Sequence, residues 1–416
     1  MFRNKIFLLT VSFAAISIFG TAQNNTNSPY TRYGYGEIPG TYSGEQKAMG
    51  GVALGLRSKT GVNTMNPASY SSVDSTTFMF DLGVTGLLSR FSSPQGAKTS
   101  FNGNLDYLNM QFPLMKNVGF SAGMLPFSFS GYNFYNNGIL PLSQYPDTIT
   151  STRTYSGRGG ISQVYAGLAI ELFDHISLGA NAYYMFGSAI NSRELRFSDS
   201  NIYGSAQSDS ITVNSFRFRY GAQFYNTFAK KHHVSLGLIY EPKVSLKAKY
   251  SEATGSVLTE LTPYEEVHSK FEMPEMLGAG LAYTFDKRLT LAADYSLTKW
   301  GDAEYMGVRD TLNNQSKISL GAEYQPNARG RYYYEKIYYR AGLNLSDPYY
   351  KIGGIQQPKN FGITFGFGLP LKNSSTVVNA AFEYGKTGNA GNLREDYFKF
   401  TLNAAFNELW FFKRKL

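Results

Sequence analysis

The sequence lacks cysteine altogether, and only 17% of its 416 residues are charged. Without cysteine the chain forms no disulfide framework and carries no lipid-modified N-terminal cysteine. A soluble domain usually has about a quarter of its residues charged, so the shortage of charge argues against an ordinary soluble chain. Long apolar runs are scarce as well. The main one, IFLLTVSFAAISIF at 6–19, is shorter than the roughly 20 residues of a membrane-spanning helix.

This short apolar run lies in the setting of a targeting segment. Arg3 and Lys5 precede it, and the small-residue sequence GTAQ follows it. A basic start, an apolar middle and a small-residue cleavage site together predict a secretory signal peptide over residues 1–22, cut near Ala22.

Acidic residues are fewer than basic residues. The net charge of +9 falls to +7 once the signal peptide is removed, because 37 basic residues then face 30 acidic ones. The basic residues occur in short turns such as AKKHH and in the terminal FFKRKL rather than along one helix or arm. We interpret them as a solvated rim that faces phospholipid head groups, rather than as a nucleic-acid patch.

Aromatic residues and glycine are abundant instead: 32 Tyr, 31 Phe and 42 Gly, with only 2 Trp. Beyond the signal peptide no helical period persists, and the recurrent pattern is an alternation of period two. Most of the alternating segments match the about 9–11 residues of a tilted membrane-spanning strand. About fourteen of them can be counted, near 76–90, 104–115, 117–130, 160–173, 175–188, 212–229, 232–250, 270–286, 288–300, 316–325, 334–346, 360–370, 375–386 and 396–411.

The polar faces of these segments distinguish a membrane barrel from a soluble sandwich, which would also alternate. In 160–173, for example, Leu168 and Ile170 share a face opposite Tyr165 and Gly167. The polar faces are rich in Gly, Ala, Ser and Asn, as a crowded interior would be, rather than in Lys and Glu. A sheet with its apolar face toward lipid must close on itself, because an open edge would leave backbone groups unpaired in hydrocarbon.

The connections also alternate in length, as in outer-membrane barrels. Short turns are predicted near 116–117, 174–175, 230–233, 286–288, QPNARGR and KNSS, and long loops near 91–103, 131–159, 189–211, 251–269, 301–315, 347–359 and 387–395. The prediction is an all-β fold, a transmembrane antiparallel β-barrel of about 14 strands over residues 76–416. It would lie in the outer membrane of a Gram-negative bacterium, in contact with its lipids. The even strand number predicts both termini on the periplasmic, short-turn side.

Residues 23–75 precede the first strand and contain no strand pattern. They carry Gly50-Gly51 and then Asn66-Pro67-Ala68, followed by Ser69. Glycine allows close backbone packing, and Asn-Pro favours a rigid turn. A barrel of this size has a lumen that needs filling, so we predict that the segment forms a plug, or hatch, inside it.

The third strand, VGFSAGMLPFSFSGYNF, contains a proline. Apolar residues lie on one face up to Met124, and after Leu125-Pro126 they move to Phe127 and Phe129. Proline cannot donate to a strand ladder and favours edges or bulges, and a bulge shifts the faces that follow it. Two interpretations remain: a lateral gap in the wall at Leu125, Pro126 and Phe127, or a bulge at the rim that merely bends the strand.

The sequence AMGGVALGL, the Asn66-Pro67-Ala68 motif and the strand pattern together resemble the FadL family of outer-membrane transporters of long-chain fatty acids and hydrocarbons. The resemblance implies a fourteen-stranded barrel, an N-terminal hatch with an Asn-Pro-Ala motif, and a kinked third strand that opens a lateral route to the bilayer. It covers the mature chain in architecture. In motifs it covers only Ala48 to Ser69 and the third strand, so the family's pocket residues are not carried over.

Residues for chemistry are few. His175, His232, His233 and His268 fall in turns or loops, and no strand places a His beside a Ser and a carboxylate. We therefore expect no catalytic residues, no metal site and no cofactor. Tyr332 to Tyr334 fit an interfacial aromatic girdle more simply than a sugar site. Charged residues expected in the lumen are Asp81, Glu171, Arg217, Arg219, Asp294, Lys336, Arg340, Glu383 and Lys399.

Arg217 and Arg219 are the best candidates among these charges for binding a ligand carboxylate. The alternatives are that the luminal charges anchor the plug, or that they pair with one another across strands in a wet interior.

Two functions follow. The first is passive uptake of hydrophobic small molecules through a luminal pocket and a wall gap near Pro126, after movement of the hatch. The second is a plugged barrel that serves as a non-transport subunit or scaffold of an outer-membrane secretion or protein-assembly complex, with its long loops and FFKRKL as docking surfaces. A continuous apolar tunnel would favour the first function. A lumen filled by polar plug contacts would favour the second.

Overall fold

The computed structural model describes residues 25–140, 149–199, 201–256, 262, 264–372, 375–389 and 391–409. The expected signal peptide and the basic C-terminal tail FFKRKL lie outside the described residues. Among the described residues, no helix is both long enough and apolar enough to cross a membrane.

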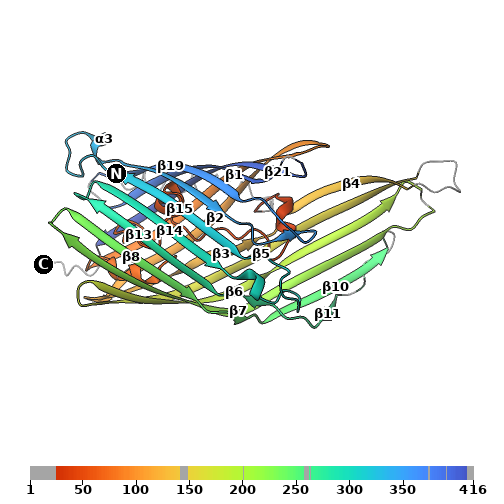
Figure 1. The fold of residues 1–416 in the computed structure, drawn as a ribbon, viewed down its shortest axis with the longest axis horizontal. Helices are drawn as coiled ribbons and strands as arrows, with labels where there is room; N and C mark the ends of the chain where they lie inside the picture. Colours follow the sequence, from red (N-terminus) through yellow and green to blue (C-terminus); the bar gives the residue numbers. More distant parts are fainter. Residues whose placement is uncertain are drawn as a thin grey trace, which may run out of the picture.

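Fourteen antiparallel strands close into a barrel (Figure 1), as predicted, and the ring closes where the last strand pairs with the first. In order around the wall they are β1 (Thr77–Ser93), β2 (Gly96–Met115), β3 (Val118–Phe129), β5 (Ile149–Leu172), β6 (Ile176–Phe197), β7 (Ser205–Phe228), β8 (His232–Glu241), β13 (Met276–Phe285), β14 (Leu289–Thr298), β15 (Gln315–Tyr324), β16 (Tyr338–Ser346), β19 (Asn360–Pro370), β20 (Val377–Gly388) and β21 (Arg394–Leu409).

The remaining elements lie in the lumen, at the long-loop end or in turns. They are η1 (Pro29–Arg32), α2 (Gly44–Ala48), η2 (Pro67–Ser72), β4 (Tyr132–Leu140), β9 (Val244–Ser245), β10 (Ala248–Ser256), β11 (Glu265–Val267), β12 (Glu272–Met273), η3 (Trp300–Asp302), α3 (Tyr333–Lys336), β17 (Lys351–Ile352) and β18 (Ile355–Gln356).

The wall has its apolar side chains outside and its polar ones inside. On β5, Leu168 and Ile170 are 49% and 44% exposed, whereas Gln163 and Tyr165 are buried. Water does not favour such an exposed apolar surface, but the hydrocarbon of a bilayer does. The inverted alternation predicted from the sequence is therefore the one that the barrel adopts.

Several predicted loops are strands. The expected long loop at 91–103 belongs to β1 and β2, which are joined through Pro94 and Gln95 alone. The strands β5, β6 and β7 have 24, 22 and 24 residues, and they run into the predicted loops 131–159 and 189–211. The predicted strand 232–250 divides into β8, β9 and the start of β10. These additions were missed because strands that extend beyond the apolar band no longer need alternating hydrophobicity.

The extra lengths of strand form what we call the projecting sheet, with the order β4-β5-β6-β7-β10-β11. It comprises residues 132–140, 149–160, 187–197, 205–213, 248–256 and 265–267. Figure 1 shows it extending from the long-loop end, well beyond the rest of the barrel.

The described residues nearest the two ends of the chain lie at different levels of the barrel. Asn25 lies beside the middle of β2, where the Asn104 amide donates to its carbonyl oxygen at 2.7 Å. The hydroxyl of Ser28 donates to Glu395 at the start of β21, next to the long loops. The end of β21 pairs with the start of β1 at the short-turn end. The termini themselves lie outside the described residues, so the prediction that both lie on the short-turn side stays a prediction. From Ser28 the chain runs down the lumen to β1, a path that counting strands does not reveal.

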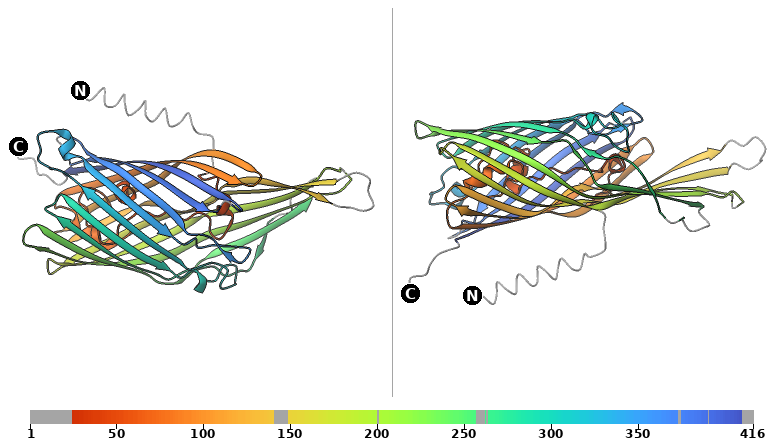
Figure 2. Two further views of the ribbon diagram at one scale, coloured as in Figure 1. Left: turned by 45° about the horizontal axis from the view of Figure 1, so that its top comes forward. Right: turned by 90° about the horizontal axis from the view of Figure 1, so that it is seen from below.

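Residues 25–76, called the N-terminal segment from here on, thread through the lumen, and their short helices lie inside the ring of strands (Figure 2). The segment touches inward-facing glycines on nine of the fourteen strands. A Cβ on Gly237 would lie 1.8 Å from the Leu54 carbonyl oxygen, and one on Gly342 would lie 2.2 Å from the Gly50 nitrogen. The glycines in contact are Gly119, Gly167, Gly179, Gly221, Gly237, Gly278, Gly280, Gly321, Gly342 and Gly366.

These contacts predict that Gly237→Ala destabilises the barrel, because the added methyl group must displace the backbone at Leu54. We expect a loss of about 1–3 kcal/mol in the free energy of unfolding, measured by urea denaturation in detergent micelles. The matched control is Gly103→Ala on β2, where a Cβ meets no atom within 4 Å. Equal effects of the two changes would contradict close packing of the N-terminal segment against the wall.

Candidate functional site

The predicted Asn66-Pro67-Ala68 motif forms a rigid turn against the wall. The Asn66 side chain caps η2, accepting from the Ala68 N–H at 3.1 Å, and its amide donates to the Leu54 carbonyl at 2.7 Å. Pro67 supplies the first residue of η2, where a missing N–H costs nothing. Wall glycines lie against this turn, since a Cβ on Gly179 would be 2.5 Å from Pro67 and one on Gly221 would be 2.2 Å from Asn66 Oδ1.

Gly50 and Gly51 end the short helix α2. Both have positive φ, 71° and 79°, which glycine adopts without steric cost. The Gly50 N–H donates to the Thr364 hydroxyl on β19 at 2.8 Å, and that hydroxyl donates to the Ala48 carbonyl at 3.0 Å. The two glycines therefore turn the chain while its backbone lies against the wall.

Carboxylates of the wall bind backbone amides of the N-terminal segment. Asp294 on β14 accepts from the N–H groups of Ala53 and Leu54 at 2.6 and 2.8 Å. Asp81 on β1 is fully buried and accepts from the Val62 N–H at 3.1 Å. Hydrogen bonds to a charged acceptor are among the stronger ones. These two predicted luminal charges thus anchor the segment.

Arg217 and Arg219 lie together on β7 and share one carboxylate. Arg217 Nη1 lies 2.5 Å from Glu241 Oε2, and Arg219 is paired with Glu241 Oε1. Arg217 also donates to Gln163 Oε1 at 2.9 Å, and Arg219 donates to the Thr64 carbonyl at 3.2 Å. The two side chains are at most 6% exposed, so they form a buried triad that also binds the N-terminal segment.

Glu241 was missed by sequence reasoning, although a signal for it was present. It shares the inward face of β8 with Ser235 and Gly237, and β8 is the neighbour of β7. Following the alternation of the predicted strand 232–250 as far as position 241 would have placed a carboxylate beside the two arginines.

The other charged residues predicted to face the lumen also contact the N-terminal segment or the wall, with one exception. Glu171 lies 3.8 Å from Arg57, and Lys399 lies 3.5 Å from Glu37, both in the N-terminal segment. Within the wall, Arg340 pairs with Glu323 at 2.6 Å, and Glu383 accepts from the Tyr397 hydroxyl at 3.2 Å.

Lys336 is the exception, because the predicted strand 334–346 starts too early. The strand β16 begins only at Tyr338, and Lys336 belongs to α3 in the connection from β15. The tyrosines Tyr332 to Tyr334 are exposed in this same connection.

Two of the four histidines, which were all expected in turns or loops, lie in a strand instead. His232 and His233, expected in a turn, are the first residues of β8, and His232 Nδ1 lies 2.7 Å from the Tyr283 hydroxyl. Within the described ranges, no group of three or more His, Cys, Asp or Glu side chains is placed to hold a metal ion.

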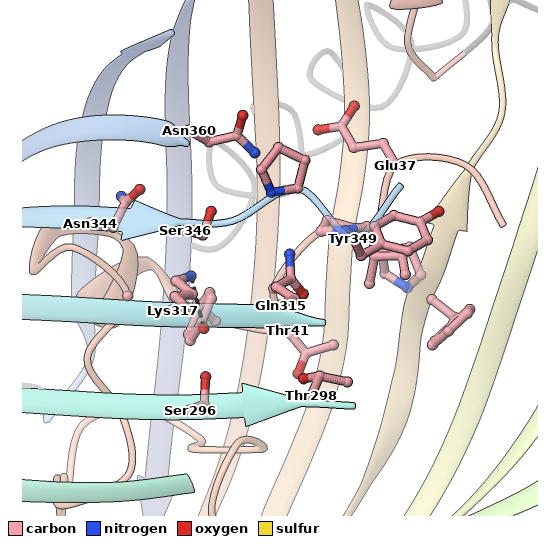
Figure 3. A pocket seen from close by; sticks show the side chains of 18 of the residues that line it. Glu37, Thr41, Ser296, Thr298, Gln315, Lys317, Asn344, Ser346, Tyr349 and Asn360 are labelled. Carbon is pink, nitrogen blue, oxygen red and sulfur yellow. Dashed lines mark hydrogen bonds between the residues drawn. The ribbon is translucent and has the colours of Figure 1, made fainter. Parts of the chain in front are cut away.

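A cavity of about 350 Å³ lies between the N-terminal segment and the wall. Polar side chains dominate one side of it, where Lys317 is surrounded by hydroxyls and amides (Figure 3). Its Nζ donates to the Tyr42 hydroxyl at 3.0 Å. The polar residues on this side are Ser296, Thr298, Gln315, Asn344, Ser346 and Asn360. Pro126, Phe127, Arg217 and Arg219 also line the cavity, which is therefore no purely apolar pocket.

An aromatic cluster lies at the long-loop end and lines part of the cavity. Tyr35 of the N-terminal segment contacts the rings of Trp300 and Tyr305 at centroid distances of 5.7 and 5.2 Å. The Tyr349 hydroxyl donates to the Gly36 carbonyl at 2.5 Å. Burial raises the pKa of Tyr35 well above its usual value, so this phenol stays neutral. Loops and N-terminal segment together form this cap.

The wall has a seam between β2 and β3. These strands pair only as far as Leu108 and Met124, and β3 is irregular between Pro126 and Ser128, as the proline predicted. The end of β3 turns to a different partner: Phe129 and Glu37 exchange two backbone hydrogen bonds of 2.8 Å.

The N-terminal segment covers the other side of this seam. Asn27 donates to Ser100 and Asn102 on β2, at 2.5 and 3.1 Å. Leu125 and Phe127 are both buried. The seam thus lies beside Leu125, Pro126 and Phe127, and residues 25–37 line it.

The buried triad predicts that Glu241→Gln is strongly destabilising, because two buried guanidinium groups then lose their counter-charge. We expect the free energy of unfolding to fall by about 3–5 kcal/mol in urea titrations. The control is Asp74→Asn, since the Asp74–Lys59 pair is about 60% exposed and should change stability little. An equally small effect of both changes would mean that Glu241 does not hold the arginines.

Solved structures of similar fold include transporters and a FadL homologue. The chain resembles the toluene transporter TodX of P. putida at 16% identity, with 89% of this chain and 98% of that chain covered and a TM-score of 0.58. A Pseudomonas aeruginosa FadL homologue matches at 13% identity, covering 89% and 99%, with a TM-score of 0.57. The Ralstonia pickettii toluene transporter TbuX matches at 13% identity, covering 88% and 98%, with a TM-score of 0.56.

These structural matches show that the chain has a FadL-like barrel fold. At such low identity they show nothing beyond the fold. No curated protein sequence matches the chain. The family model that matches is described as BamG and covers residues 1–416. The resemblance to FadL proteins therefore holds for the fold, whereas the family has a different name. The chain belongs to the BamG family.

Proposed function

We propose that this protein is a plugged, non-conducting barrel that serves as a subunit of an outer-membrane protein complex for secretion or protein assembly. The observation that carries the proposal is the contact of the N-terminal segment with wall glycines on nine strands. A segment held against so much of the wall leaves little room for a passage.

Two further features support a plug over a mobile hatch. Asp81, Asp294 and Arg219 bind its backbone from three different strands. The aromatic cluster around Tyr35 packs at the long-loop end, and part of that cluster belongs to the same N-terminal segment. Opening a path would break both sets of contacts. The name of the family, BamG, also points toward association with a protein complex.

Passive uptake of a hydrophobic molecule is the second candidate, and the seam beside Pro126 favours it. The cavity extends to Pro126 and Phe127, where β2 and β3 no longer pair. In that function a ligand would leave sideways into the bilayer. The charged and hydroxyl-rich lining around Lys317 suits an apolar ligand poorly, because an apolar ligand would desolvate these groups without bonding them.

A mild-detergent extract from native membranes tests the first candidate. We expect the barrel, at its natural level, to migrate in a complex with other proteins in fixed ratio, and to carry no stoichiometric hydrophobic small molecule by mass spectrometry. A free barrel that retains a lipid or hydrocarbon in fixed ratio would overturn this proposal.

Uptake of a labelled fatty acid by whole cells tests the second candidate. We expect Pro126→Ala, which restores a backbone N–H at the irregular part of β3, to leave uptake unchanged. The control is Pro113→Ala on β2, near the short-turn end. A loss of uptake with Pro126→Ala, and none with Pro113→Ala, would establish transport through the seam.

A further inference from the structure

The two outer edges of the projecting sheet differ in how they are protected. Among the described residues, β4 pairs only with β5, and β11 pairs only with β10. The strand β11 has three residues, two of which are Glu265 and Glu266. Short length and charge are the usual protections against unwanted pairing of an edge.

The β4 edge has none of these protections. Its sequence YNFYNNGIL runs for nine residues without a charge or a proline, and its pairing with β5 has no bulge. Tyr135 and Ile139 are each 69% exposed. A long, uncharged edge with exposed apolar side chains is a template for another strand, which a stable protein keeps covered.

Charge near this edge indicates what would cover it. Paired residues of antiparallel strands share a face, so Arg153 lies on the same face as its neighbour Asn136 on β4. Arg193 pairs with Tyr155 on that face, and the Arg32 guanidinium lies 4.2 Å above the Tyr155 ring. In the described part of the chain, none of these three arginines forms an ion pair with a carboxylate.

We propose that β4 is completed by an extended strand of a partner protein that presents carboxylates on the face of Arg153 and apolar side chains on the opposite face. The proposal rests on the proposed function, because it names the contact surface of that complex. A carboxylate opposite Asn136 would lie two strand spacings from Arg153, about 9.6 Å, which an arginine and a glutamate side chain span together. Tyr135 and Ile139 would pack against the apolar face.

The chain has no cysteine, so a single introduced cysteine is the only thiol of this chain. Asn133→Cys, Tyr135→Cys and Asn137→Cys place a thiol along one face of β4, and Glu266→Cys on β11 is the control on the opposite edge. Each variant is isolated in its native complex and labelled with a maleimide that carries a benzophenone cross-linker, and the cross-linked residues are identified by mass spectrometry.

Strand addition predicts a specific pattern. The three β4 positions cross-link to one acidic segment of one partner, in steps of two residues that run along that segment in a constant direction. We expect their yield to exceed that of Glu266→Cys by about tenfold, because only a paired strand lies within about 5 Å of the label. Scattered attachment sites, lipid adducts only, equal yields from both edges, or attachment to a second copy of this chain would overturn the proposal.

Amide hydrogen exchange of the unaltered protein provides a measurement that needs no variant. Exchange at 132–139 is expected to slow by about tenfold or more in the complex relative to the isolated barrel, because pairing protects amides, while exchange at 265–267 stays the same. Unchanged exchange at β4 in a complex that does contain partners would refute the edge proposal and leave the proposed function standing. A barrel that co-purifies with no protein would refute the proposed function itself.

Discussion

Backbone groups enclosed in a barrel are largely cut off from bulk water, so each N–H and C=O inside needs a partner from the protein. The N-terminal segment contains only short helices and no strand of its own, and many of its partners therefore come from the wall. Asp294, Asp81 and Thr364 accept its N–H groups, and Gln223 donates to its carbonyls. Wall side chains reach these groups only if the backbones are close, which is what inward-facing glycines permit.

The same constraint acts where the wall is interrupted. At the seam between β2 and β3, two strand edges face a lumen and a membrane without pairing with each other. Glu37 replaces the missing partner of Phe129, and Asn27 bonds polar side chains of β2. The N-terminal segment is thus both the filling of the lumen and part of its wall. Beyond the bilayer, at β4, the unpaired edge has no such replacement among the described residues.

The barrel could be predicted from the sequence because lipid imposes a period of two on every strand that crosses it. The turn at Asn66 and the glycines at 50 and 51 were found for a similar reason, since only a few residue types adopt those local conformations. Contacts between distant segments carry no such signal. Nothing in the sequence around Gly237 shows that it meets Leu54, and Arg217 and Arg219 suggest a ligand site until Glu241 is placed beside them. The projecting strands were missed because, outside the bilayer, no constraint forces their side chains to alternate.

The N-terminal segment connects the long-loop end of the lumen to the contacts inside the barrel. Tyr35 belongs to the aromatic cap, and Gly50 to the contact with β16 and β19, yet only a short stretch of chain separates them. Displacing the cap would move residues close to those that bind the wall, and loosening them would remove bonded amides from the buried Asp81 and the half-buried Asp294. An opened state would then hold carboxylates without their bonded amides, which is costly wherever such a group stays buried. In the proposed role as a plugged subunit, this coupling keeps the N-terminal segment against the wall, and the wall carries the projecting sheet at the long-loop end.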